Sequence, residues 1–141
     1  MQTQETEKTE TGQEIRILLV DDGSMYSLSV LDGLKKQGFK SIEMAINGRC
    51  SLDYLKNGNF GLIISNWKRR EMSGIELLQM IRKNHAYENI PFFMLAHPAD
   101  KKTLEFALNQ GVHRFFPQPV DFESLAQAIL QIGYKNGALS S

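Results

Sequence analysis

Short runs of consecutive apolar residues alternate along the chain with segments in which apolar residues recur every three or four positions. Continuous runs are typical of buried strands, and the wider spacing is typical of helices that bury one face. The segment 42–46 alternates apolar with mixed residues, which is typical of a strand at the edge of a sheet. The patterns predict strands at 15–20, 42–46, 62–64, 91–96 and 114–116, and helices within 25–34, 52–55, 75–81, 104–108 and 122–129.

Five strand–helix units in strict alternation predict an α/β fold. Each right-handed crossover must return across the sheet, so the strands are parallel and the helices cover both faces. In such a doubly wound sheet the ligand crevice lies at the carboxyl ends of the strands. We therefore expect chemistry-bearing residues directly after the first, third, fourth and fifth strands.

The two ends of the chain depart from this pattern. Residues 2–14 contain no aliphatic or aromatic side chain, so they cannot offset their ordering entropy by burial. We expect a flexible polar tail over 1–14, one domain over 15–133 and a short C-terminal tail over 134–141.

Composition narrows the function classes. The 141 residues include 16 Lys+Arg and 16 Asp+Glu, and this formal net charge of zero disfavours nucleic-acid binding. Cys50 is the single cysteine, which excludes an internal disulfide and a cysteine-based zinc cluster. No apolar run approaches the ~18 residues of a membrane span, and the residues after Met1 do not resemble a signal peptide. We expect a cytoplasmic protein that does not bind membranes.

Two adjacent carboxylates, Asp21 and Asp22, follow the first predicted strand. Carboxylate oxygens are the ligands that Mg²⁺ prefers, but the same residues, with Ser24, also suit the N-terminus of a helix. Both interpretations stay open on these residues alone. No Ser/His/Asp or Cys/His set falls on the strand ends, so we expect the protein not to be an enzyme.

Four segments together resemble the bacterial response-regulator receiver domain. They are Ile-Leu-Leu-Val-Asp-Asp at 17–22, Leu-Ile-Ile-Ser-Asn-Trp at 62–67 with Met-Ser-Gly at 72–74, Phe-Phe-Met-Leu-Ala at 92–96, and Phe-Phe-Pro-Gln-Pro at 115–119. Their order and spacing match along 15–133, and the chain looks most similar to single-domain chemotaxis regulators of the CheY-like type. The resemblance implies a flavodoxin-like, doubly wound sheet of five parallel strands in the order 2-1-3-4-5 with five helices.

The resemblance also implies a phosphorylation cycle. A receiver accepts a phosphoryl group from a histidine kinase on the Asp that ends its third strand, with Mg²⁺ held by the acidic pair. A Ser or Thr after the fourth strand and a Lys after the fifth contact the phosphate, and an aromatic residue on the fifth strand changes rotamer. In this sequence the acidic pair, the aromatic residue and the following proline match as Asp21, Asp22, Phe115 and Pro119, whereas the acceptor, hydroxyl and lysine positions hold Asn66, Ala96 and Gln118.

These three departures remove the nucleophile, the hydroxyl and the cation of the switch. The amide of Asn66 is a poor nucleophile that cannot form an acyl phosphate, Ala96 offers no hydroxyl, and Gln118 carries no charge. Replacing Asp and Lys together keeps the formal charge of the pocket at −2 and avoids stranding a half-buried lysine, which indicates a coordinated replacement. We therefore predict a receiver-like module that is not phosphorylated.

Three further predictions concern the pocket. The charged segment 68–71 is either a solvated loop or places Lys68 or Arg69 on the acidic pair as a tethered cation. A weak Mg²⁺ site at Asp21, Asp22 and the backbone carbonyl of Lys68 also stays open. No other cofactor is expected. The Gln118–Pro119 peptide bond, at the place of the family's Lys-Pro bond, is predicted to be cis.

The expected function is protein–protein interaction. Receivers dock partners or dimerise through the face of the fourth helix, fifth strand and fifth helix, which predicts contacts at Lys101, Lys102, Phe106, Phe115 and Gln127. A histidine kinase or a chemotaxis or flagellar motor component is the expected partner, and a homodimer stays open. Two alternatives remain: a regulator phosphorylated at a non-standard acceptor such as Ser65 or Ser73, and a flavodoxin-like cofactor protein, which the acidic loop after the first strand disfavours.

Overall fold

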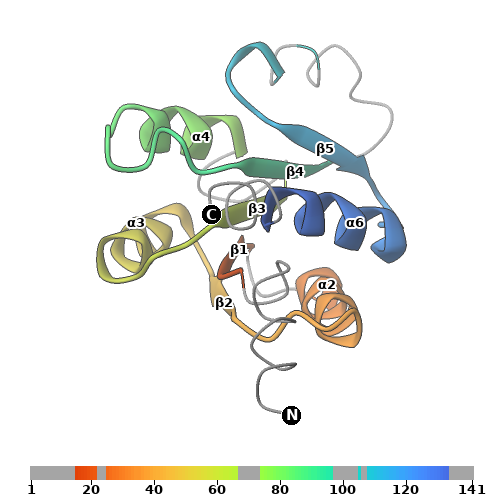
Figure 1. The fold of residues 1–141 in the computed structure, drawn as a ribbon. Helices are drawn as coiled ribbons and strands as arrows, with labels where there is room; N and C mark the ends of the chain where they lie inside the picture. The colour runs from red at the N-terminus through yellow and green to blue at the C-terminus, as the bar shows by residue number, and fades with distance from the viewer. Residues whose placement is uncertain (1–14, 22–24, 67–73, 97–104, 106–107, 134–141) are drawn as a thin grey trace.

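Figure 1 shows a central sheet with helices on both faces. The computed structural model describes residues 15–21, 25–66, 74–96, 105 and 108–133. The strands are β1 (Ile17–Val20), β2 (Ile42–Ala45), β3 (Leu62–Asn66), β4 (Phe92–Ala96) and β5 (Arg114–Pro117). The helices are α2 (Met25–Lys36), α3 (Gly48–Asn57), α4 (Gly74–Arg82) and α6 (Phe122–Gly133).

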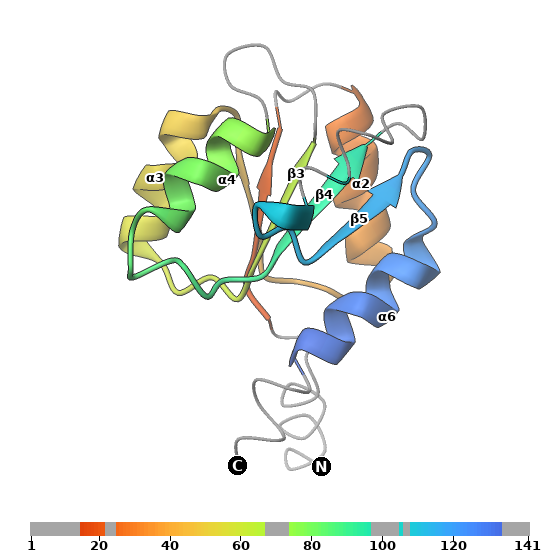
Figure 2. The same ribbon diagram turned by 90° about the horizontal axis from the view of Figure 1, so that it is seen from above.

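All neighbouring strands pair in parallel, in the order β2-β1-β3-β4-β5. This arrangement confirms the predicted five-stranded sheet, its strand order and the position of β2 at an edge. Because the strands are parallel, their carboxyl ends lie along the same edge of the sheet, as the arrowheads in Figure 2 show. None of the described helices has both the length and the apolarity that a membrane span requires.

The sheet separates two apolar layers, because successive residues of a strand face opposite sides. In β1, Ile17 and Leu19 pack in the layer that contains residues of α2 and α6. Leu18 and Val20 pack in the layer that contains residues of α3 and α4. All four side chains are fully buried, as expected of a strand covered on both faces.

Local sequence sets the ends of several helices. Asn47 is the N-cap of α3, and its Oδ1 accepts a hydrogen bond of 2.7 Å from the backbone N–H of Cys50. The helix ends at Asn57, and Gly58 is its C-cap. The α2 helix ends shortly before Gly38, whose φ of +99° is a left-handed conformation that favours glycine.

The number of helices differs from the prediction. The described residues contain four helices rather than five. The fifth predicted helix, at 104–108, falls largely outside the described residues. Of the residues that are described there, Glu105, Leu108 and Asn109 are helical. The predicted tails at 1–14 and 134–141 also lie outside the described residues.

Strand boundaries differ from the apolar runs by one or two residues. The first strand begins at Ile17 rather than Ile15, and β4 begins at Phe92. In contrast, β3 and β5 extend beyond their apolar runs to Asn66 and Pro117. The backbone hydrogen bonds of a ladder do not depend on apolar side chains, so pairing continues after the hydrophobic pattern has ended.

Candidate functional site

The carboxyl ends of four strands meet at one edge of the sheet, as predicted. Asn66 of β3 pairs with Leu95 of β4, and the next residue, Ala96, pairs with Pro117 of β5. This register brings four sequence-predicted positions to neighbouring strand ends, namely Asp21, Asn66, Ala96 and Gln118.

Gln118 connects three strands at this edge. It directly follows β5, and its backbone N–H donates to the carbonyl oxygen of Ala96 in β4 at 3.1 Å. Its side-chain Nε2 donates to the Oδ1 of Asn66, the last residue of β3, at 2.9 Å. Both side chains are partly buried. The two neutral residues that were predicted to be a coordinated replacement therefore bond each other directly.

Asp21, which follows β1, and Ala96, which ends β4, are both buried, and their strands lie on either side of β3. The backbone N–H of Asp21 donates to the carbonyl oxygen of Ala45 in β2 at 3.0 Å, and 2% of the residue is exposed. Ala96 is 1% exposed, and its methyl group presents no hydrogen-bonding atom. Three other predicted members of the pocket lie outside the described residues: Asp22, Lys68 and Arg69.

Ser65 is one of the two alternative acceptors, and it is fully buried. Its Oγ donates to the backbone carbonyl oxygen of Asn66 at 3.1 Å. A hydroxyl closed off from solvent is a poor acceptor, because attack on phosphorus requires contact with a donor molecule. The other alternative, Ser73, lies outside the described residues.

Comparison with known proteins decides the family. The sequence model of the response regulator receiver domain matches residues 17–130. This chain belongs to the response regulator receiver family. The receiver assignment replaces the flavodoxin-like alternative, and it places the protein in two-component signalling.

Individual relatives of this receiver agree with the assignment. Chemotaxis protein CheY-3 of Vibrio cholerae is 28% identical over 120 residues, which cover 85% of this chain and 92% of the relative. The structure of the chemotaxis response regulator CheY4 of Vibrio cholerae matches with a TM-score of 0.74 at 24% identity, covering 84% of this chain and 98% of that one.

A third match has a metal in its site. The receiver domain of a sensor histidine kinase from Pseudomonas aeruginosa, with a magnesium ion coordinated in its active site cleft, has a TM-score of 0.75. It is 17% identical, and the match covers 85% of this chain and 98% of that one. At this identity the likeness shows the receiver fold alone.

The described part of this receiver does not contain a complete magnesium ligand set. Within the described residues no group of three or more His, Cys, Asp or Glu side chains could hold a metal ion. Asp21 supplies a carboxylate, but the Oδ1 of Asn66 already accepts the hydrogen bond from Gln118. Mg²⁺ in proteins is usually held by one or two carboxylates together with several waters, and the second predicted carboxylate, Asp22, lies outside the described residues.

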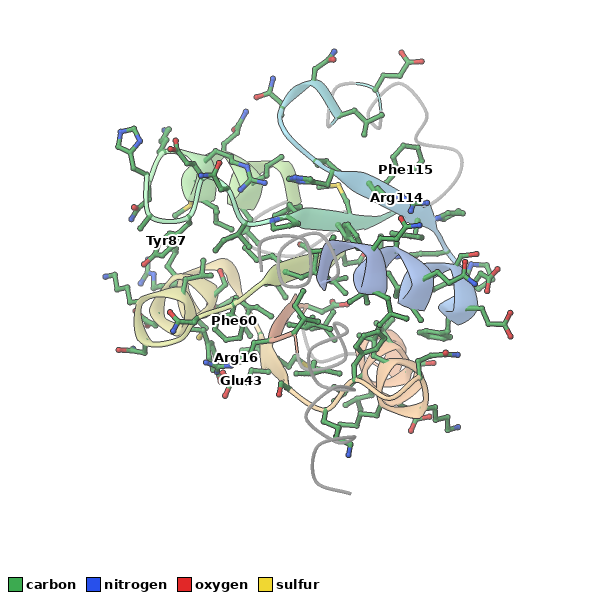
Figure 3. All side chains as sticks on the ribbon, in the orientation of Figure 1. Arg16, Glu43, Phe60, Tyr87, Arg114 and Phe115 are labelled. Atoms are coloured by element: carbon green, nitrogen blue, oxygen red, sulfur yellow. The ribbon has the colours of Figure 1, made fainter. Side chains whose placement is uncertain are left out.

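The fifth strand of the receiver places its aromatic residues in opposite layers. Phe115 is partly buried against the layer that contains residues of α3 and α4. Phe116 packs in the other layer, with its ring centroid 5.3 Å from that of Phe93 and the rings tilted by 51°. The guanidinium of Arg114 lies 5.1 Å from the centroid of the Phe116 ring. Figure 3 shows Arg114 and Phe115 together on β5.

Other predicted residues of the partner face are described in part. Gln127 is exposed on α6, and Pro119 is exposed and joined to Gln118 by a cis peptide bond, as predicted. Leu108, in the segment before β5, is 43% exposed. The remaining predicted contacts lie outside the described residues: Lys101, Lys102 and Phe106.

A polar cluster that the sequence did not predict lies at the amino end of the first strand. The guanidinium of Arg16 lies 4.7 Å from the centroid of the Phe60 ring and 3.7 Å from a carboxylate oxygen of Glu43 (Figure 3). Arg16 and Glu43 also border a pocket of about 330 Å³, whose other lining residues are Asp53, Tyr54, Asn57 and Gly58. The only sequence signal was the single charged residue in the first apolar run. The pocket contains none of the predicted site residues.

A second unpredicted cluster lies where β4 and β5 begin. The backbone N–H of His113 donates to the carbonyl oxygen of Phe92 at 2.9 Å, and its ring Nδ1 accepts from the Phe92 N–H at 3.3 Å. Arg82 donates to the carbonyl oxygens of Tyr87 at 3.1 Å and Gly111 at 3.3 Å. Burial lowers the pKa of His113, and the positive charge of Arg82 lowers it further. Folding therefore favours the neutral form of the His113 imidazole over the protonated form.

Proposed function

We propose that this receiver acts in two-component signalling without being phosphorylated, by binding protein partners. The observation that carries the proposal is the hydrogen bond from the Nε2 of Gln118 to the Oδ1 of Asn66. Asn66 stands at the position where a receiver has its phosphate-accepting Asp. Its side chain is a neutral amide whose oxygen already receives a hydrogen bond from Gln118.

The chemistry of the strand ends supports the absence of phosphoryl transfer. An acyl phosphate forms when a carboxylate oxygen attacks phosphorus, and an amide oxygen cannot give that product. Ala96 presents a methyl group where a hydroxyl would contact the phosphoryl oxygens. Gln118 is neutral, so it cannot stabilise the charge that develops on the transferred group. Because Ser65 is fully buried, it does not offer a substitute acceptor.

The proposed activity is binding rather than turnover. The partner face comprises β5, α6 and the segment around residue 108, where Leu108 is 43% exposed and Gln127 is exposed. From the sequence, Lys101, Lys102 and Phe106 belong to the same face. Because the matched relatives include chemotaxis proteins, the partner class proposed is a histidine kinase or a chemotaxis or motor component. A homodimer through this face is an alternative that the binding experiment below separates.

Magnesium is not required by this proposal. A tethered cation, Lys68 or Arg69, is proposed to neutralise the acidic pair in its place. A titration of the protein with Mg²⁺ tests this point, with the NMR chemical shift of the Asp21 backbone amide as the readout. Tight magnesium binding at Asp21 and Asp22 would contradict the tethered cation.

Incubation with a small acyl-phosphate donor tests the loss of phosphorylation. The purified full chain is treated with the donor and Mg²⁺, and its intact mass is measured before and after hydroxylamine treatment. We expect no added mass of about 80 Da, the signature of one phosphoryl group. A hydroxylamine-labile adduct would overturn the proposal, and loss of a stable adduct in Ser65→Ala would assign it to that hydroxyl.

Capture of partners from a native extract tests the binding face. Full-length protein and the variants Phe115→Ala and Lys101→Glu are used as baits, with Glu88→Ala, an exposed site outside this face, as the matched control. We expect the wild type and the control to retain one or more signalling proteins that both face variants lose. Self-association alone, measured by analytical ultracentrifugation (sedimentation velocity) of the purified chain, would favour the homodimer instead.

A further inference from the structure

We infer that Gln118 is a positioning residue. Its two hydrogen bonds, to Ala96 of β4 and to Asn66 of β3, are called the clasp below. The clasp holds the carboxyl end of β5 in one position without phosphate or metal. The inference rests on the proposed function only in assigning β5 to the partner face. The clasp itself stands on the hydrogen bonds around Gln118.

The two bonds of Gln118 act on different strands. The β4–β5 ladder ends with the pair Ala96 and Pro117, and the Gln118 N–H extends it by a further backbone bond to Ala96. The side chain of Gln118 then passes over the end of β4 to Asn66 of β3. Through these bonds Gln118 connects the carboxyl ends of β3, β4 and β5, which are consecutive strands of the sheet.

The clasp is uncharged, which sets how it responds to solution conditions. Neither amide ionises in the physiological pH range, and neither bond is an ion pair. An Asp–Lys pair at the same positions would weaken as salt screens it, and it would lose one charge when the carboxyl is protonated. The neutral clasp should therefore stay closed across the pH and salt ranges in which the fold is stable.

The clasp is close to the residues that the partner face uses. Gln118 follows directly on β5, which carries Arg114 and Phe115. The Phe116 ring packs on Phe93 in the core, so β5 is fixed by this ring contact near its middle and by the clasp at its end. Opening the clasp should loosen the end of β5 while the core contact remains.

Hydrogen exchange of the full chain measures this coupling. The exchange rates of the β5 amides are compared in the wild type, Gln118→Ala, Asn66→Ala and the double variant. Loss of one neutral hydrogen bond should raise these rates by about fivefold in each single variant, with no further rise in the double variant, because both substitutions break the same bond. Gln131→Ala, an exposed glutamine of α6, is the matched control and should exchange like the wild type.

Conservative variants keep the test decisive if the alanine variants unfold. Asn66→Asp retains an oxygen that accepts from Gln118 and should keep the β5 amides protected, whereas Gln118→Met keeps the side-chain length, lacks the donor and should lose protection. Additive effects of the two alanine substitutions, or wild-type protection in Gln118→Met, would overturn the clasp. A change in wild-type protection on adding Mg²⁺ with a phosphodonor would also overturn it.

The outcomes separate the clasp from the proposed function. A phosphoryl adduct on the wild type contradicts the proposed function whatever the exchange rates show. Additive exchange effects contradict the clasp, even when no adduct forms.

Discussion

Asn66 and Gln118 are 52 residues apart in the sequence and are joined by a side-chain hydrogen bond of 2.9 Å. Taken one at a time, these residues are two separate predicted departures from the phosphorylation site of a receiver. Taken together, they are the two halves of one neutral contact that closes the carboxyl end of the sheet. This contact is the one that the predicted coordinated replacement of the acceptor and the lysine calls for.

On the proposed function, introducing the acceptor, hydroxyl and lysine that the family resemblance implies should make the chain phosphorylatable. The triple variant Asn66→Asp, Ala96→Ser and Gln118→Lys regains the nucleophile, the hydroxyl and the cation, so we expect a hydroxylamine-labile adduct after treatment with an acyl-phosphate donor and Mg²⁺. Intact-mass measurement reads the result. The matched control carries Asn66→Ala with the other two changes and should stay unmodified, because it has no carboxylate. An adduct on that control would show that another residue is the acceptor.

Replacing Gly33 by alanine should destabilise the protein although alanine is the better helix former. A Cβ built at Gly33 lies 2.4 Å from two ring carbons of Phe122, so α2 and α6 must separate or the ring must move. The helix-propensity gain is about 1 kcal/mol, whereas overpacking costs about 1–3 kcal/mol. The difference is a net loss, so we expect the free energy of unfolding to fall by up to about 2 kcal/mol in urea denaturation.

Two variants show whether the Phe122 ring is the cause. In the background Phe122→Leu, Gly33→Ala should cost less than in the wild type, because the clashing ring carbons are gone. Ser29→Ala, at an exposed position of the same helix, should change stability by less than about 0.5 kcal/mol. An equal cost of Gly33→Ala in both backgrounds would rule out the ring contact.

The stability of the protein should depend on the protonation of His113. Its pKa is lowered in the folded state, so the unfolded state binds more protons near the ordinary histidine pKa of about 6.5. The stabilisation is therefore fully present above that pH and is lost as the pH falls through it toward the lower folded-state pKa. Protonation also removes the ring acceptor used by the Phe92 N–H.

Urea denaturation at a series of pH values measures this effect. His113→Gln should flatten the decline in unfolding free energy below about pH 6.5, and His85→Gln should leave it in place because it does not alter His113. The size of the decline should be modest, since His113 is exposed to solvent, which screens its interactions. A profile that His113→Gln does not change would assign the decline to other groups.

The aromatic contact between Phe93 and Phe116 should be among the strongest single contributions to stability. Phe116 is 5% exposed and packs on Phe93 at a centroid distance of 5.3 Å. Phe116→Ala should lower the free energy of unfolding by about 3–5 kcal/mol, because it leaves a cavity in a packed layer. Ile46→Ala removes an apolar side chain that is 58% exposed and should cost less than about 0.5 kcal/mol. Equal losses in both variants would contradict this account of the core.

The amino-acid sequence by itself determined the number of strands, their parallel arrangement and the edge at which the candidate site lies. These properties follow from local patterns: apolar runs such as 17–20 and 92–96 are buried on both faces, and each strand–helix unit has one favoured handedness. The sequence also placed Asn66, Ala96 and Gln118 at or directly after strand ends, where the family resemblance predicts the site residues.

Only the tertiary structure decided how those residues contact one another. The bond between Asn66 and Gln118 exists because β4 lies between β3 and β5 and a side chain reaches across its end. The burial of Ser65 and the exposure of Leu108 depend likewise on which elements cover them. A periodic pattern reports which side of an element is apolar, but neighbours distant in the sequence determine whether that side is covered and which polar atoms meet there.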